Sequence, residues 1–219
     1  MKKIISMLLL GSILGCSNHL ELSDEAKLLE LIPSNAALLE RVEGEPELVV
    51  GDLNHDGLND IAAVIETKDQ GTAQREVIVL FKTKENTYDI SLRTDKFVMN
   101  EDEGGVWGDP LKSISIEEGA LVINHYGGSN WRWYIEQKLI YKDNNWYLSY
   151  IRNGTYFTGE QTSDEADETI FDLLTGNFSI RERGKDGDFI VKEGRNNNLK
   201  LLNINDVTDD WIDLKDLIK

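Results

Sequence analysis

The strongest chemical signal in the sequence is a run of oxygen-bearing side chains between residues 52 and 60. These side chains occupy positions 1, 3, 5 and 9 of the run: Asp52, Asn54, Asp56 and Asp60. Calcium takes about six to eight hard oxygen ligands, so short polar side chains at alternate positions allow one tight loop to surround the ion. The backbone carbonyl of Leu58 is a further candidate ligand, and Gly57 permits the sharp turn. The spacing therefore predicts a calcium-binding loop.

A second interpretation of the same run is a hairpin turn, rich in Asp and Asn, that holds no ion. His55, at the fourth position, is expected to face the solvent and not to bind metal. The run departs from an EF-hand, because that motif has Glu at position 12 and this chain has Ala63 there. The flanking segments 48–51 and 61–65 are apolar and predict the two strands of a hairpin around the run.

The run resembles the Asp-x-Asp-x-Asp-Gly-x-x-Asp calcium loops of FG-GAP repeats in integrin-type propellers. This resemblance implies that the four side chains listed above and the carbonyl of Leu58 are calcium ligands, and that the ion is structural. Asn54 stands where the repeats have Asp, which removes one negative charge. The loop occurs once in the chain, whereas a propeller repeats its motif from blade to blade, which argues against a complete propeller.

The N-terminus has the features of an export signal. Two lysines precede an apolar stretch over residues 4–14, which is too short to cross a bilayer as a helix of about 20 residues. The stretch ends at Gly15 and Cys16, and this ending resembles the lipobox of bacterial lipoproteins. The resemblance implies cleavage after Gly15 and a lipid anchor on Cys16, in the outer membrane if the host has two membranes, because Ser17 follows the cysteine. The alternative is an ordinary secretory signal with a chance cysteine.

Composition argues against several classes of function. The chain has a formal net charge of −17 and a pI near 4.5, which disfavours nucleic acid as a partner because a phosphate backbone attracts clusters of Lys and Arg. Hydrophobic residues make up 40% of the chain, which is enough for a folded core. A single Cys can form neither an internal disulfide nor a multi-cysteine zinc site. The oligomeric state does not follow from the sequence.

The apolar pattern predicts one short helix followed by strands. The helix is expected over residues 24–32, with Pro33 as its stop. Twelve strands are expected, over residues 37–42, 47–51, 61–66, 76–82, 88–93, 113–117, 121–126, 131–141, 146–152, 168–174, 177–182 and 189–192. Turn residues at hairpin spacing separate most of them. The predicted fold class is therefore mainly β, with antiparallel meander sheets that are sandwich-like or partial-propeller-like and one short N-terminal helix.

The same pattern sets the expected organisation of the chain. Residues 1–15 are expected to form a lipoprotein signal peptide, residues 16–22 a lipidated tether, and residues 23–219 a single mainly-β domain. Residues 160–168 carry five acidic side chains and predict an exposed loop, and residues 209–218 predict a short acidic helix.

Two segments combine glycine with aromatic residues. Residues 104–110 read Gly-Gly-Val-Trp-Gly-Asp-Pro, and residues 125–133 read His-Tyr-Gly-Gly-Ser-Asn-Trp-Arg-Trp. Together with the Asp-Leu-Asn-x-Asp-Gly start of the oxygen-rich loop, they resemble a family of bacterial secreted proteins and lipoproteins. The resemblance spans roughly residues 49–176 and implies an envelope protein, but it supplies no activity.

These segments supply six candidate ligand-binding side chains: Trp107, Asp109, His125, Tyr126, Asn130 and Arg132. In a carbohydrate or peptide groove, flat indole rings would stack on the ligand and the polar groups would hydrogen-bond to it. In the alternative, Trp131 and Trp133 share a strand face and fill the core, and Arg132 pairs with a carboxylate such as Asp109. A pair formed by His125 and Asp109 is conceivable as a general base, but no catalytic residue is predicted.

Two functions follow from these observations. The first is a calcium-stabilised, non-catalytic binding or interaction domain, attached by lipid to the bacterial cell envelope, with a glycan or an envelope protein as partner. The alternative is an envelope glycan-binding protein or hydrolase that uses residues 104–133.

Overall fold

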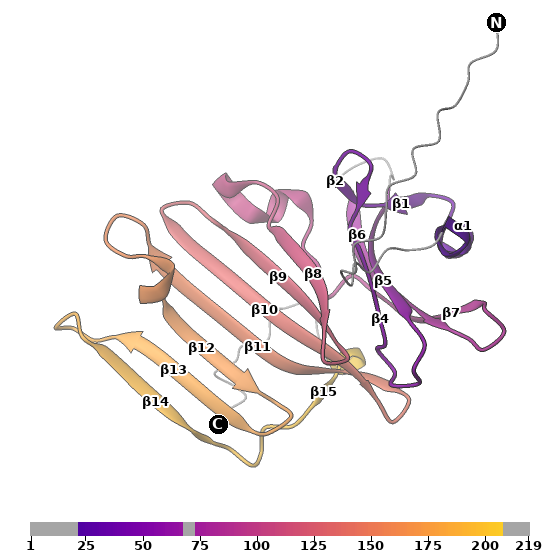
Figure 1. Cartoon of the computed structure of the whole chain (residues 1–219). Coiled ribbons are helices and arrows are strands. Elements are labelled where there is room, and N and C mark those ends of the chain that lie inside the picture. Colours follow the sequence, from indigo (N-terminus) through magenta and orange to yellow (C-terminus); the bar gives the residue numbers. More distant parts are fainter. Residues whose placement is uncertain (1–21, 68–72, 208–219) are drawn as a thin grey trace, which may run out of the picture.

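The computed structural model describes residues 22–67 and 73–207. The predicted signal peptide, Cys16 and the predicted helix over residues 209–218 lie outside these residues. The described chain forms two large antiparallel sheets and a small two-stranded one, with one short α-helix beside the first large sheet (Figure 1). The predicted fold class, mainly β with antiparallel meander sheets and a short N-terminal helix, is confirmed.

The first sheet has five strands: β1 (Ala36–Leu38), β4 (Leu48–Gly51), β5 (Asp60–Thr67), β6 (Gln74–Lys82) and β7 (Tyr88–Thr94). Their order is β1-β5-β6-β7, and β4 also pairs with β5. Strand β5 is buried along Ile61–Ile65 because both of its faces are covered. Leu28 of α1 (Leu22–Leu31) packs in one cluster with Ile61 and Ile65, whereas Ala62 and Val64 belong to the core shared with the second sheet. A strand covered on both faces reads as a continuous apolar run.

The second sheet has eight strands: β8 (Leu111–Glu117), β9 (Ala120–Gly128), β10 (Trp131–Lys142), β11 (Asn145–Phe157), β12 (Asp167–Asp172), β13 (Asn177–Arg183), β14 (Phe189–Arg195) and β15 (Leu202–Asn203). From β8 to β14 each strand pairs with the next, and β15 pairs with β11. The β8–β9 turn has positive φ at Glu118 (51°) and Gly119 (79°), and the β10–β11 turn at Asp143 (49°) and Asn144 (60°). Two positive φ values in a two-residue loop match the twist of the flanking strands, which explains the predicted turn positions.

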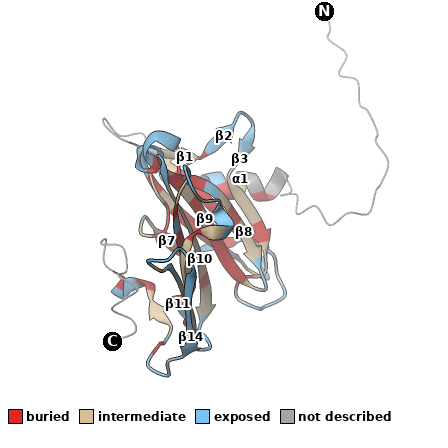
Figure 2. Ribbon diagram, turned by 90° about the vertical axis from the view of Figure 1, so that its left-hand side faces the viewer, coloured by how far each residue is buried: buried red, intermediate tan, exposed pale blue. Residues whose placement is uncertain are grey.

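One face of the second sheet packs on the first. Leu121 and Ile123 of β9 share a core cluster with Val77 and Val79 of β6. Figure 2 shows the buried residues concentrated between the two layers. The other face of the second sheet is open, and β12, β13 and β14 lie beyond the first sheet in Figure 1. All seven residues of β14 are exposed.

Short elements connect the sheets. A small hairpin pairs β2 (Glu40–Val42) with β3 (Glu45–Pro46), and three 3-10 helices follow later: η1 (Glu101–Trp107), η2 (Ser163–Glu165) and η3 (Ile204–Asp206). Among the described helices, none has the length and apolar character needed to span a membrane.

Three predicted segments differ from the structure. The strand expected over residues 37–42 is broken at Leu39, whose side chain enters the core. Strand β11 continues five residues beyond the predicted end at 152. Glycine is a poor strand former, but Gly154 stays in the strand because an aromatic ring, described below, lies where a side chain would be. The acidic stretch expected as an exposed loop ends in β12, where Glu168 is partly buried.

Candidate functional site

The oxygen-rich loop connects β4 and β5, as the sequence predicts, and its polar side chains bind the loop's own backbone. Asp52 accepts hydrogen bonds from the backbone N–H groups of Asp56 (3.2 Å) and Gly57 (2.9 Å). Asp56 accepts one from Leu58 (2.7 Å). The backbone at His55 and Gly57 has φ values of 63° and 85°, which the tight turn requires.

Asp60 lies at the end of the loop and is fully buried. Its two carboxylate oxygens accept hydrogen bonds from the backbone N–H groups of Leu53 (2.9 Å) and Lys82 (3.0 Å). Burial raises the pKa of Asp60 above its ordinary value and outweighs these two hydrogen bonds, and the negative charges of Asp56 and Asp52 add to the rise. A divalent cation bound between these carboxylates would relieve their electrostatic repulsion.

The donor set of this loop fits calcium in its chemistry: carboxylate, amide and backbone oxygens within nine residues. In the described residues, however, no three His, Cys, Asp or Glu side chains converge as a metal cage. The carboxylates are turned onto backbone N–H groups, so an ion would have to compete for them. His55 is exposed, and its ring packs against Gly119 of the β8–β9 turn, where a Cβ would lie 2.3 Å from the ring.

A glycine-rich strap over residues 99–110 crosses from the first sheet to the second. It includes η1, and positive φ values at Gly105 (66°) and Gly108 (94°) shape its turns. Gly104 packs so closely on Pro110 that an added Cβ would lie 3.0 Å from the proline nitrogen. These constraints explain the glycine spacing of the segment, and they leave the Trp107 side chain half exposed at the end of η1.

The strap is anchored by Arg75 of β6, which is only 3% exposed. Its guanidinium donates to both carboxylate oxygens of Asp109, at 2.7 and 2.9 Å, and to Glu66 at 3.2 Å. Its backbone N–H donates to the side chain of Asn100. Partial burial would raise the pKa of Asp109, but the hydrogen bonds from Arg75 and Leu111 and the charge of Arg75 hold it below the usual value.

This geometry corrects two expectations about Asp109. Its partner is Arg75, so it forms neither the predicted pair with Arg132 nor the pair with His125. His125 is 2% exposed, and its Nε2 accepts a hydrogen bond from the backbone N–H of Met99 (3.2 Å). Burial, together with the charge of Arg75, lowers the pKa of His125 to about 4, against the opposing effect of Asp109. The His125 side chain is therefore an uncharged part of the core.

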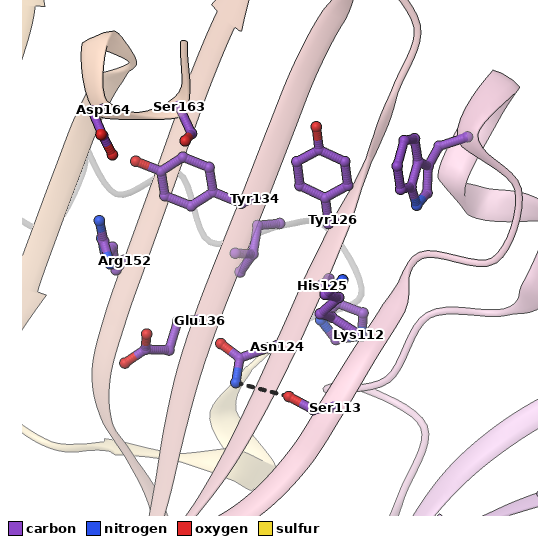
Figure 3. Close-up of a pocket in the computed structure, with 12 residues that line it drawn as sticks. Lys112, Ser113, Asn124, His125, Tyr126, Tyr134, Glu136, Arg152, Ser163 and Asp164 are labelled. Atoms are coloured by element: carbon purple, nitrogen blue, oxygen red, sulfur yellow. Dashed lines mark hydrogen bonds between the residues drawn. The ribbon is translucent and has the colours of Figure 1, made fainter. Parts of the chain in front are cut away.

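A pocket of about 480 Å³ lies on the open face of the second sheet (Figure 3). Side chains at alternate positions of β9, β10 and β11 form its floor, and η1 and η2 contribute its rim. The residues that matter most for its shape and chemistry are Trp107, Asn124, Tyr126, Tyr134, Glu136 and Arg152.

Two tyrosines lie side by side on the floor, because Tyr126 of β9 and Tyr134 of β10 are direct partners in the sheet register. Figure 3 shows both rings face-on above the strands. The Tyr134 ring extends over Gly154 of β11, where a Cβ would lie 2.1 Å from the ring. Its hydroxyl donates to Glu168 (2.5 Å), which also accepts from Arg152 (2.6 Å). Burial and the contact with Glu168 raise the pKa of the Tyr134 phenol.

Trp107 forms a wall beside this floor. Its ring meets Tyr126 edge-on, with the ring centroids 4.8 Å apart and the planes at 79°. The Arg132 guanidinium lies 4.7 Å from the Trp107 ring centre and donates to the carbonyl of Gly128. Tyr126 shares a hydrogen bond of 2.7 Å with the hydroxyl of Tyr156, whose pKa is raised to about 12 by burial and by this contact. Trp107 and Tyr126 therefore hold each other in place, with Arg132 and Tyr156 supporting them.

The structure brings together only part of the predicted ligand set. Trp107 and Tyr126 line the pocket, and Arg132 lies over the Trp107 ring without belonging to the lining, whereas Asp109 belongs to the strap anchor. His125 is one of the lining residues, but it is almost fully buried, and strand alternation puts its imidazole on the buried face of the sheet. Asn130 lies in the exposed β9–β10 turn, where its carbonyl accepts two hydrogen bonds from Thr158.

The two neighbouring tryptophans lie on the opposite face from the pocket. Trp131 is 62% exposed and packs against Phe157, so the expectation that it fills the core is wrong. Trp133 is partly buried beneath Gly127, where a Cβ would lie 2.4 Å from its ring. Sequence reasoning missed Tyr134, Glu136 and Arg152 as pocket residues. The available signal was the period of two along β10, which places Tyr134 and Glu136 on the face of Arg132.

No protein-family model matches this chain, and comparisons with curated proteins and with solved structures found no match.

Proposed function

We propose that this chain is a lipid-anchored binding domain of the bacterial cell envelope, and that its ligand occupies the pocket on the open face of the second sheet. The observation that carries the proposal is the pocket itself: a preformed hollow of about 480 Å³ that combines the half-exposed Trp107 and two partly buried tyrosines with a few placed polar groups. This combination is typical of small-molecule and glycan sites. The lipobox-like sequence around Cys16 supports the location.

The polar contacts favour binding over turnover. Glu168 is held between Tyr134 and Arg152, and Asp109 is held by Arg75, so these charges are engaged in fixed pairs. Fixed pairs preorganise a surface and lower the entropic cost of binding a ligand. His125, which the sequence offered as a base, has its side chain turned away from the pocket.

In this proposal calcium is a structural ion of the β4–β5 loop. Asp52, Asn54, Asp56 and Asp60 would hold it through side-chain oxygens, and Leu58 through its carbonyl. The ion would neutralise the carboxylates and stiffen a loop that abuts the β8–β9 turn through His55. Its contribution is to stability, and the pocket residues carry the ligand.

The binding proposal is tested by a ligand-observed NMR screen of the purified chain against a mixed library of saccharides, peptides and organic anions. We expect at least one class to bind the wild type and to lose binding in Tyr134→Ala. Trp131→Ala is the control, because it removes an exposed aromatic ring from the opposite face. A library without a binder, or binders indifferent to Tyr134→Ala, would refute the proposal.

A second candidate is a glycan hydrolase at the same pocket. Glu136 and Asp164 both contribute to its lining, and most glycosidases use two carboxylates. A release assay with chromogenic glycosides tests this function: hydrolysis that is lost in Glu136→Gln while binding persists would favour it over a binding domain.

A further inference from the structure

The floor of the pocket is suited to a flat ligand with an apolar face. The rings of Tyr126 and Tyr134 lie beside each other, and Figure 3 shows their faces turned to the open side of the sheet. Gly154 is what allows this arrangement at Tyr134, because any larger residue would push the ring away from the strand. Aromatic faces carry partial negative charge and attract the polarised C–H groups of a sugar ring as well as apolar surface.

The wall limits how such a ligand can lie. Trp107 stands at 79° to Tyr126, so the two rings form a corner instead of a stack. A ring lying on the tyrosines would meet the indole at one edge. The wall is held from both sides, because Arg132 lies over the indole and the strap is fixed by the ion pair of Arg75 with Asp109. The corner is therefore preformed.

Groups that hydrogen-bond to hydroxyls surround this corner. Asn124 donates to the Ser113 hydroxyl (3.3 Å), which orients its amide and leaves the amide oxygen as an acceptor (Figure 3). Glu136 is the direct register partner of Asn124 on one side and of Arg152 on the other. Two acceptors, the Asn124 amide oxygen and the Glu136 carboxylate, and one donor, the Arg152 guanidinium, thus follow one another along one line across the three strands.

The four charged side chains of the lining carry formal charges that sum to zero: Lys112 and Arg152 against Glu136 and Asp164. Arg152 is already paired with Glu168 beside the pocket, and the whole chain has a net charge of −17. A ligand with several negative charges would be repelled by the chain as a whole, and a strongly positive ligand would meet Lys112 and the guanidinium of Arg152 at the lining. An uncharged ligand meets neither penalty.

We infer that the pocket takes an uncharged oligosaccharide, with one sugar ring on the Tyr126–Tyr134 floor, its edge against Trp107, and its hydroxyls hydrogen-bonded to Asn124, Glu136 and Arg152. This inference rests on the proposed binding function and names its ligand class. The Tyr134 hydroxyl is already committed to Glu168, and the Arg152 guanidinium lies 5.2 Å from the centre of the Tyr134 ring. The sugar therefore contacts the part of the Tyr134 ring face that Arg152 leaves open, with the guanidinium beside it.

Isothermal titration of the purified chain tests the inference with tetrasaccharide probes of three charge types. The neutral probes are β-1,4-glucose, α-1,4-glucose and β-1,4-N-acetylglucosamine tetramers, and the charged ones are galacturonic acid and glucosamine tetramers. We expect millimolar or tighter binding of at least one neutral probe and weaker binding of both charged probes.

Variants locate the site. Tyr134→Ala and Trp107→Ala are expected to weaken binding by roughly tenfold or more, because each removes an aromatic anchor. Tyr134→Phe keeps the ring and should stay close to wild type, which separates stacking from hydrogen bonding. Trp131→Ala, on the other face, should not change affinity, and circular dichroism of each variant checks folding.

The outcomes separate this inference from the proposed function. Preferential binding of a charged probe, with loss in Tyr134→Ala, would keep the binding site and overturn the neutral ligand class. Binding of a peptide or anion from the library, with no binding of any of the five tetrasaccharides, would also keep the binding site and overturn the neutral ligand class. If no compound of any class binds, both the inference and the proposed function fail.

Discussion

Replacing Asp109 by Ala tests how the strap that carries Trp107 is held. The change removes two hydrogen bonds, of 2.7 and 2.9 Å, from a guanidinium that is 3% exposed. Breaking a buried ion pair costs about 3–5 kcal/mol; because Glu66 stays 3.2 Å from Arg75 and the Asp109 side chain is 26% exposed, we expect about 2–3 kcal/mol. For a chain of this size, that loss lowers the Tm by about 4–12 °C.

The pH dependence identifies the charge as the cause. The contacts with Arg75 keep the pKa of Asp109 in the folded state below the ordinary value of 3.8. The ionised carboxylate therefore contributes its full stability above about pH 4, and the contribution is lost as the pH falls through the folded pKa. The difference in unfolding free energy between wild type and Asp109→Ala is expected to be largest at neutral pH and to shrink below about pH 4.

Urea denaturation at pH 7 and near pH 3 measures this difference. Glu117→Ala is the matched control, since it removes a carboxylate paired with Lys138 on the surface, where the Glu117 side chain is 51% exposed. An exposed pair contributes about 0–1 kcal/mol. A loss in Asp109→Ala that is no larger than the control, or that is equal at both pH values, would refute the anchoring role of the ion pair.

Three further predictions concern calcium, lipid and histidine. Calcium is expected to raise the Tm in scanning calorimetry, since an ion at about 100 times its Kd contributes about 2.7 kcal/mol of stability. Combining Asp52→Ala with Asp56→Ala should abolish this increase. An unchanged increase in the double variant would exclude the β4–β5 loop as the calcium site. Cys16→Ala should move the protein from the membrane fraction to the soluble fraction on immunoblots, because the anchor is lost; wild type found only in the soluble fraction would contradict this. NMR titration should give His125 a pKa of about 4. Since an unfolded His titrates near 6.5, stability should fall as the pH drops from about 6.5 towards 4, and a normal titration would contradict this burial effect.

The secondary structure was predictable because its causes are local. Alternation and turn residues place the strands of the second sheet, and the uninterrupted apolar run at 61–65 marks the strand that is covered on both faces. The exceptions are also physical. The sequence at Leu39 reads as one continuous strand, but the core draws that side chain inward and the chain changes sheets there.

The pocket was only partly predictable because it depends on contacts between distant segments. The sequence offered Asp109 two partners from the β9–β10 hairpin, and the true partner, Arg75, comes from the other sheet. Likewise, Tyr126 and Tyr134 become neighbours only through the register of that hairpin, which the turn geometry sets. Residue types indicated an aromatic site, but its members follow from the pairing.

The positions of the two sites predict that calcium and ligand act independently. The oxygen-rich β4–β5 loop touches the turn before β9, through His55 on Gly119, whereas the strap approaches the end of β9, where a Cβ on Gly105 would lie 3.8 Å from Gly128. The nine residues of β9, at about 3.3 Å each, separate these contacts by about 30 Å. Chelating calcium should therefore lower the Tm but leave the affinity of a pocket ligand unchanged at temperatures where circular dichroism shows a folded protein. A drop in affinity under those conditions would mean that the loop shapes the pocket, and that the ion is more than a local staple.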